Sequence, residues 1–346
     1  MQPLRFGRRQ WLASALSLAG VGAGSAWAQP RLTKLRLLLA GAEPTFHLLP
    51  LRIADRRGFF AAEGLDVELR DAGGTAKAHQ ALADGSADVV AGAFERTLTA
   101  QAKNGFLTAF VLLGRAPQVA LGVSVRALPA YKSAADLKGR KIGVSSFGSA
   151  SDMVARLALA REGVPAQQVG FVELGAYGPA VAALRSGQVD AISHMETAIS
   201  MLEQKGELRI VADTRTLKGT QELFGGPMPA ACLYATAAYL QKNAQTAQAL
   251  ANAVVRALKW LQTAGPSDII KVSPESYFLG DRGLYLASFN KVRETIALNG
   301  LIPEEGARTA LRTVAALDPA FKLAEVNLAR SFNNDFAKLA TKRFGG

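Results

Sequence analysis

The fold of this chain is decided by a stretch of sequence that occurs twice. It reads Ala81-Leu82-Ala83-Asp84-Gly85-Ser86-Ala87-Asp88 before the apolar run Val89-Val90-Ala91, and Ala183-Leu184-Arg185-Ser186-Gly187-Gln188-Val189-Asp190 before Ala191-Ile192. In both copies the end of a helix is followed by a glycine that can close it, and an aspartate then opens a short buried strand. The chain therefore contains two copies of one helix–turn–strand unit.

The match between the two copies continues upstream. Glu63-Gly64-Leu65 precedes a predicted strand at 66–69, and Glu162-Gly163-Val164 precedes one at 169–174. Two further strand–loop–helix units begin with strands at 35–40 and 141–144, and the second continues into a helix at 153–161. Each half is thus predicted as β-α-β-α-β, the alternation that builds a parallel sheet with helices on both faces. From about residue 241 the chain is predicted to be mostly helical, with helices at 247–263, 308–317 and 323–339.

The first 28 residues have the features of an export signal. Arg8-Arg9-Gln10-Trp11-Leu12 is a twin-arginine core, an uncharged run follows, and Ala26-Trp27-Ala28 is the small-x-small pattern of a cleavage site. A membrane anchor is the alternative, but a span needs about 20 mostly apolar residues, and this run is shorter and rich in glycine. We expect cleavage after Ala28 and a mature protein in the periplasm that starts at Gln29.

Length and charge limit the remaining possibilities. The 346 residues carry a formal charge of +12, and the signal contributes three arginines and no acid, so the mature chain carries 12 − 3 = +9. The basic residues are scattered, which indicates a solvated basic surface and no nucleic-acid partner. About 318 residues remain after cleavage, enough for two domains of ordinary size. The single Cys232 is expected to be buried as a small hydrophobe.

The motifs of several enzyme classes are missing. The sequence has no His-Glu-x-x-His, no Cys-x-x-Cys and no phosphate-binding Gly-x-x-x-x-Gly-Lys-Ser/Thr. His47 and His194 both follow predicted strands, so a shared metal is conceivable, but no carboxylate spacing supports it. His79 falls in a predicted helix, where packing or solvent is its default environment. We therefore expect no catalytic residues, no metal and no cofactor.

Ligand-binding loops are expected at the carboxyl ends of the strands, because ligands of open α/β sheets bind beyond those ends. In Gly148-Ser149-Ala150-Ser151, a glycine admits a close backbone approach and a hydroxyl can cap a helix, and Gly74-Thr75 repeats this arrangement in the other half. The N–H groups of such helix starts favour a carboxylate, sulfonate or phosphate. An ordinary helix cap without a ligand is the alternative.

Acidic and aromatic residues in the same loops indicate a different ligand. Three glutamates follow strands, whereas Arg96 is the only nearby arginine; the glutamates are Glu43, Glu95 and Glu196. Their carboxylates could accept hydrogen bonds from N–H or O–H groups of a planar ring. The aromatic residues that could enclose such a ring are Phe46, Phe94, Phe147 and Tyr177. Apolar packing behind the loops is the alternative for these side chains.

Two motifs resemble those of solute-binding proteins of ABC importers. Residues 53–68 resemble the A-x-x-x-G-F-F-x-x-E-G-L-x-V-E stretch of that family. A second stretch resembles another hallmark of that family and reads Ala135-Asp136-Leu137-Lys138-Gly139-Arg140-Lys141-Ile142-Gly143-Val144. The branch that they resemble holds binders of sulfonates, taurine and nitrate and of thiamine-pyrimidine precursors. The cysteine-rich signature of the eukaryotic pyrimidine synthases is missing.

The resemblance implies a type II periplasmic-binding fold, an α/β fold whose two lobes close on a ligand by a hinge. It implies lobe I at 31–118 and 240–346, and lobe II at 119–239. It further implies a monomer that captures a small-molecule solute and delivers it to an ABC permease in the cytoplasmic membrane. By position, the family's ligand loops correspond to Thr45, Phe46, Gly74, Thr75, Phe94, Glu95, Ser149, Ala150, Tyr177 and Glu196.

Two other functions remain open from the sequence. One is an enzyme on the same scaffold, a pyrimidine synthase or a hydrolase, which a turnover assay would separate from a binding protein. The other is a sensor module, for which the sequence offers no attached signalling domain. Glu95 departs from what a sulfonate site suggests and favours a nitrogenous or hydroxylated ligand.

Overall fold

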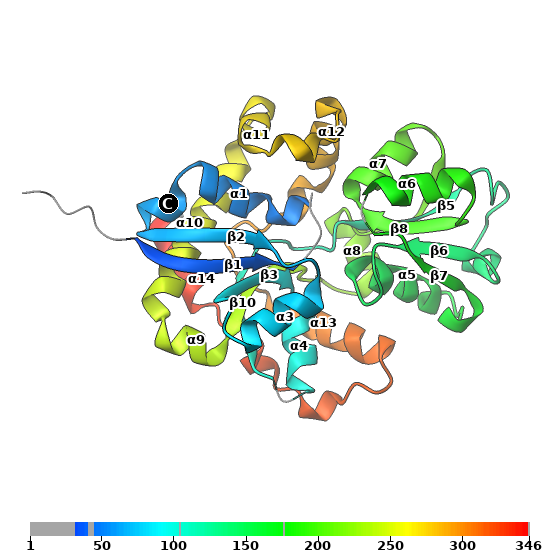
Figure 1. Cartoon of the computed structure of the whole chain (residues 1–346). Coiled ribbons are helices and arrows are strands. Elements are labelled where there is room, and N and C mark those ends of the chain that lie inside the picture. Colours follow the sequence, from blue (N-terminus) through cyan, green and yellow to red (C-terminus); the bar gives the residue numbers. More distant parts are fainter. Residues whose placement is uncertain (1–31, 41–44, 104, 176, 345–346) are drawn as a thin grey trace, which may run out of the picture. The chain divides into compact units, whose positions relative to one another are not determined.

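Two sheets of five strands each organise the chain (Figure 1). This computed structural model describes residues 32–40, 45–103, 105–175 and 177–344. The predicted export signal with its cleavage site, and the candidate acid Glu43, lie outside the described residues. The first sheet has the order β2 (Leu65–Asp71), β1 (Thr33–Leu39), β3 (Val89–Ala93), β10 (Ala231–Thr236) and β4 (Leu107–Leu112). The second has the order β7 (Gly170–Glu173), β6 (Lys141–Val144), β8 (Ala191–Met195), β5 (Val119–Ser124) and β9 (Leu208–Asp213).

The two sheets share one topology. In each, the fourth strand in the order is antiparallel to both of its neighbours, and the other paired strands are parallel. In the first sheet this strand is β10, which is distant in sequence from β1 to β4, and in the second sheet it is β5, the first of five consecutive strands. The predicted pair of mostly parallel sheets is therefore confirmed, and the repeated sequence units correspond to β3 and β8.

The position of β10 differs from the predicted lobe boundary. Residues up to 239 were expected in lobe II, but Ala231–Thr236 pairs with β3 and β4 of the first sheet. The backbone N–H of Phe94 also donates to the carbonyl oxygen of Ala230 at 2.7 Å. The chain therefore returns to the first sheet before residue 231. An apolar run such as 230–235 carries no local signal of which sheet it joins.

Helices cover both faces of each sheet. In the second sheet, α6 and α7 pack on one face with the apolar cluster around Ile192, and α5 packs on the other with the cluster around Ile142 (Figure 1). One larger cluster holds the first sheet and the C-terminal helices together. The helices from α1 to α7 are α1 (Leu49–Arg56), α2 (Phe59–Ala62), α3 (Thr75–Ala83), α4 (Glu95–Gln101), α5 (Ala150–Arg161), α6 (Tyr177–Ser186) and α7 (Glu196–Gln204). The others are α8 (Leu217–Phe224), α9 (Ala237–Lys242), α10 (Ala244–Thr263), α11 (Pro266–Val272), α12 (Arg282–Val292), α13 (Glu304–Leu317) and α14 (Asp335–Phe344).

The helix predicted at 323–339 is wrong. The segment instead forms two short 3-10 turns, Leu323–Glu325 and Leu328–Arg330, before α14 begins at Asp335. Asparagine side chains explain the interruption, because Asn327 Oδ1 accepts from the N–H of Ala329 at 3.0 Å and Asn333 Oδ1 accepts from that of Asp335 at 2.8 Å. Such local hydrogen bonds compete with helical ones. The helices predicted at 247–263 and 308–317 are confirmed as parts of α10 and α13.

Two segments connect the sheets, and they run side by side. The N–H of Thr214 donates to the carbonyl oxygen of Val119 at 2.8 Å, and the N–H of Gln118 donates to that of Thr214 at 3.2 Å. Gln118 has a φ of 57°, a left-handed conformation that is uncommon for a residue with a side chain. Its amide also donates to the hydroxyl of Thr295 at 2.9 Å.

Among the described residues, every helix is too short or too polar to span a bilayer.

Candidate functional site

A cavity of about 470 Å³ lies where the carboxyl ends of the parallel strands of both sheets meet. Loops after β1, β2 and β3 line it from the first sheet, and loops after β6, β7 and β8 line it from the second. This is the position at which open α/β sheets bind ligands. The volume lies within the range of pockets for small organic molecules.

Most of the predicted ligand residues line this cavity, and three do not. Those in its wall are Thr45, Gly74, Thr75, Glu95, Ser149, Ala150 and Tyr177. The three that lie elsewhere are Phe46, Phe94 and Glu196. The sequence alone could not separate these groups, because all ten residues follow strands of the two sheets.

Phe46 and Phe94 pack behind the loops. The Phe46 ring lies 5.1 Å from that of Tyr285 and 5.9 Å from that of Phe289, so it anchors the loop after β1 to α12. Phe94 is completely buried, with its ring 6.3 Å from that of Phe332. Both aromatic rings therefore occupy the packing role that was the alternative to ligand contact.

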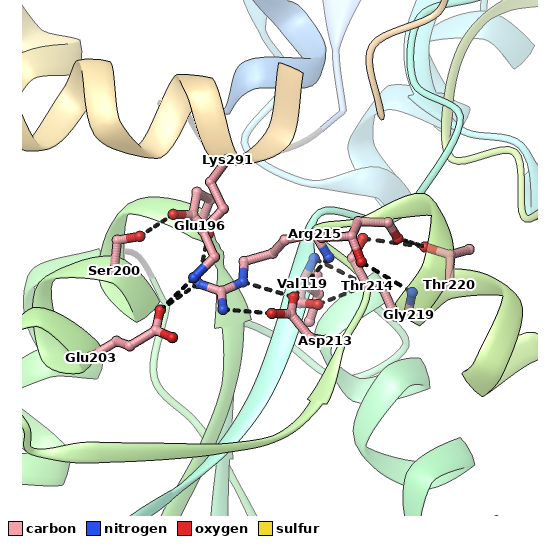
Figure 2. Close-up of polar contacts among 11 residues, drawn as sticks. Val119, Glu196, Ser200, Glu203, Asp213, Thr214, Arg215, Gly219, Thr220 and Lys291 are labelled. Atoms are coloured by element: carbon pink, nitrogen blue, oxygen red, sulfur yellow. Dashed lines mark hydrogen bonds and ion pairs between the residues drawn. The ribbon is translucent and has the colours of Figure 1, made fainter. Parts of the chain in front are cut away.

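Glu196 is paired within the protein, as Figure 2 shows. It is 2% exposed, its carboxylate contacts the Arg215 guanidinium at 3.0 Å, and it also accepts a hydrogen bond from Ser200. Arg215 is itself completely buried and contacts Asp213 at 2.7 Å and Glu203 at 3.0 Å. The position after β8 thus holds a buried ion pair and not a free acceptor.

Lys291 extends this group across to another element. Its ammonium lies 2.7 Å from the Glu203 carboxylate, so α12 is joined to α7 (Figure 2). Because α12 also packs on Phe46, it contacts loops that follow strands of both sheets. We refer to Glu196, Glu203, Asp213, Arg215 and Lys291 as the Arg215 cluster.

Glu95 holds the corresponding position in the first sheet but has a different environment. Like Glu196, it is the first residue of the helix that follows the middle strand of its sheet. It is 7% exposed and lines the cavity, yet no other side chain of the described residues donates a hydrogen bond to it or forms an ion pair with it. Burial raises the pKa of Glu95 above its ordinary value, although the Arg96 charge acts in the opposite direction.

The start of α5 presents hydroxyl groups to the cavity. Ser149 caps the helix by accepting from the N–H of Asp152, and its hydroxyl lies 3.1 Å from that of Ser145 and 2.9 Å from that of Ser151. The Asp152 carboxylate accepts from the N–H of Gly148 at 2.9 Å and contacts Arg156 at 2.7 Å. The first helical turn retains N–H groups that have no partner within a helix. The start of α3 at Thr75 faces the same cavity from the first sheet.

Arg96 is the cationic side chain in the cavity wall. Its guanidinium donates to the carbonyl oxygen of Gly148, so it connects α4 to the loop that precedes α5. Its Nε is buried and has no hydrogen-bond partner among the described residues. The acids of the wall are Glu95 and the exposed Asp71, whose carboxylate accepts from the N–H of Gly73 at 2.8 Å.

Two histidines of the wall were not among the predicted ligand residues. The Nε2 of His47 contacts the carbonyl oxygen of Ala116 at 2.8 Å, and that of His194 contacts the carbonyl oxygen of Gly175 at 3.1 Å. Burial lowers the pKa of His47 to about 4 and also lowers that of His194, so both rings are neutral near pH 7. Their positions, in the segment between β1 and α1 and near the end of β8, were the available sequence signal. No group of three or more histidine, cysteine or acidic residues in the described part of the chain could hold a metal ion.

Comparisons with known proteins agree with this architecture. A family model described as NMT1/THI5 like matches residues 45–266. A protein of Bordetella bronchiseptica RB50 of known structure is 50% identical, with a TM-score of 0.84 over 90% of this chain and 98% of that chain.

Two more distant structures share the fold. The nitrate-binding protein NrtA of Synechocystis PCC 6803 is 17% identical, with a TM-score of 0.71 over 91% of this chain and 89% of its own. The alkanesulfonate-binding protein SsuA of Xanthomonas axonopodis pv. citri, bound to MOPS, is 19% identical, with a TM-score of 0.66 over 89% of this chain and 99% of its own. The expected type II periplasmic-binding fold is therefore confirmed.

Proposed function

This chain belongs to the NMT1/THI5-like family, and from that premise we propose that it is the exported solute-binding component of an ABC import system. In this proposal the mature monomer captures one small organic solute in the periplasm. It then delivers the solute to a permease in the cytoplasmic membrane. The observation that supports this function best is the cavity of about 470 Å³ whose wall combines loops of both sheets.

The polar groups of the wall suggest how a solute is held. Ser149 and Thr75 lie at the starts of α5 and α3, whose N–H groups favour an acidic or strongly hydrogen-bonding part of a ligand. Tyr177 adds an aromatic surface, and the neutral His47 and His194 can exchange hydrogen bonds without adding charge. The wall is thus suited to an organic solute with more than one polar end.

Closure of the two lobes follows from the same proposal. The connecting segments meet at Gln118 and Thr214, where backbone hydrogen bonds join them. A hinge at this place would bring the wall residues of the second sheet onto a solute held by the first. Small-angle scattering should then give a smaller radius of gyration for the protein saturated with its solute than for the solute-free protein.

The proposed function is tested by comparing what host cells remove from their medium with and without this chain. A deletion strain should leave at least one small organic compound in a complex medium that the parent strain depletes. The wild-type chain should restore depletion, and Ala150→Trp, which introduces a bulky ring at the cavity wall, should not. Leu339→Trp, at an exposed position of α14, is the matched control and should restore it. Identical depletion by parent and deletion strains contradicts an import function.

A further inference from the structure

We infer that the solute carries a protonated nitrogen, an amine or amidine type of group, which the Glu95 carboxylate binds in the wall of the cavity. The inference rests on the proposed function and narrows it to one class of solute. It starts from the comparison of two glutamates at corresponding positions of the two sheets.

The first step is that Glu95 lacks the partner that Glu196 has. Both are buried glutamates at the start of a helix, but Glu196 contacts Arg215 at 3.0 Å and accepts from Ser200. For Glu95, no side chain of the described residues donates a hydrogen bond to the carboxylate or forms an ion pair with it. Burial raises its pKa, and its own backbone N–H is the donor that acts in the opposite direction. Native proteins pair buried charges, because an uncompensated buried charge is costly. Glu95 is therefore built to receive its partner from outside the chain.

The second step is that the cationic side chain nearest to Glu95 acts on its pKa through space but forms no ion pair with it. Arg96 follows it directly, but the Arg96 guanidinium donates to the carbonyl oxygen of Gly148 and forms no ion pair with Glu95. On β10, burial and then the Glu95 charge raise the pKa of the Cys232 thiol, which keeps this neighbour neutral. The other titratable neighbours, His79 and Tyr234, form a pair with each other at 3.1 Å.

The third step concerns the polar groups that share the cavity wall with Glu95. Glu95 lines this wall together with Thr75 and Ser149, whose helix starts favour an acceptor group. A solute with a cationic nitrogen at one end would form a charge-assisted hydrogen bond with Glu95, the stronger class of hydrogen bond. A neutral amide in the same place would leave the buried charge without compensation.

The experiment uses three probes of nearly equal size and shape that differ in charge: benzamidine, benzamide and benzoate. Calorimetry on the mature protein should show benzamidine binding, with the other two weaker by about tenfold or more. Glu95→Gln should weaken benzamidine binding by about 10- to 100-fold. Glu68→Gln, an exposed acid on β2 outside the cavity wall, is the matched control and should change it by less than about threefold.

A second readout does not depend on any probe. Because Glu95 is buried without a partner, Glu95→Gln should raise the melting temperature of the solute-free protein at pH 8 by about 2–4 °C. Glu196→Gln should lower it, because that substitution breaks a pair. A lower melting temperature for Glu95→Gln would overturn the inference.

Four results with the probes would also overturn the inference that the solute carries a protonated nitrogen. These are no benzamidine binding at about 10 mM, equal binding of benzamide, preference for benzoate, or benzamidine affinity that survives Glu95→Gln. A solute that the chain imports but that lacks a basic nitrogen would overturn this inference and leave the proposed function standing. A chain that binds benzamidine through Glu95 but supports no uptake would overturn the proposed function and leave this inference standing.

Discussion

Replacing Arg215 by methionine should strongly destabilise the protein. The Arg215 side chain is 0% exposed and holds Glu196, which is 2% exposed, so Arg215→Met leaves a buried carboxylate without a counter-charge. Removing one partner of a buried pair costs about 3–5 kcal/mol. Asp213 and Glu203 lose the same partner but can turn to water, since they are 28% and 34% exposed. We therefore expect Arg215→Met to lower the free energy of unfolding by about 3–5 kcal/mol.

Urea unfolding followed by circular dichroism measures this cost. The control is Arg185→Met, because Arg185 contacts Glu207 at 2.8 Å but the two side chains are 45% and 36% exposed. This exposed pair should contribute about 1 kcal/mol or less. The double variant Arg215→Met/Glu196→Gln should regain about 1–3 kcal/mol over Arg215→Met, since it removes the orphaned charge. A loss below about 1 kcal/mol for Arg215→Met, or no gain in the double variant, would refute the reasoning.

Three further predictions concern pH, the helix cap and export. Burial alone would raise the pKa of Asp213, but the hydrogen bonds and charge of Arg215 outweigh it and hold that pKa below 3.8. The stability from Asp213 is therefore present above its unfolded pKa and lost as pH falls through the lower folded pKa, so the unfolding free energy should decrease as the pH is lowered from about 5. This decrease should be shallower in Asp213→Asn when urea titrations are repeated at successively lower pH. Ser149→Ala should cost about 1 kcal/mol through loss of the α5 cap, and an unchanged melting temperature would contradict the assigned cap. Finally, N-terminal sequencing of the periplasmic protein should begin at Gln29, and replacing Arg8 and Arg9 by lysine should leave the chain in the cytoplasm with its signal intact.

The paired sheets could be predicted from the sequence because the signal is local and occurs twice. A glycine that ends a helix and an apolar run that follows an aspartate are short-range features, and they identified β3 and β8. The entry of β10 into the first sheet is a long-range pairing. An apolar strand is compatible with either sheet, so its place depends on contacts that no local pattern encodes.

The candidate site was predictable to the level of loops but not of side chains. Strand ends placed Glu95 and Glu196 beyond their sheets, and both follow the same pattern. What separates them is Arg215, which comes 19 residues after Glu196 and reaches it because β9 ends beside α7. The same limit applies to Phe46, whose neighbours Tyr285 and Phe289 lie far along the chain. Burial and pairing of side chains depend on tertiary packing, which the order of residues shows only indirectly.

Native mass spectrometry tests the central claim, the capture of a solute in the cavity, most directly. The mature protein purified from its host should carry one additional small molecule per chain, which is lost on unfolding. Ala150→Trp, within the cavity wall, should appear at its bare mass, whereas the exposed control Leu339→Trp should retain the molecule. Equal native and unfolded masses for the wild-type protein, or retention of the molecule by Ala150→Trp, would contradict the account.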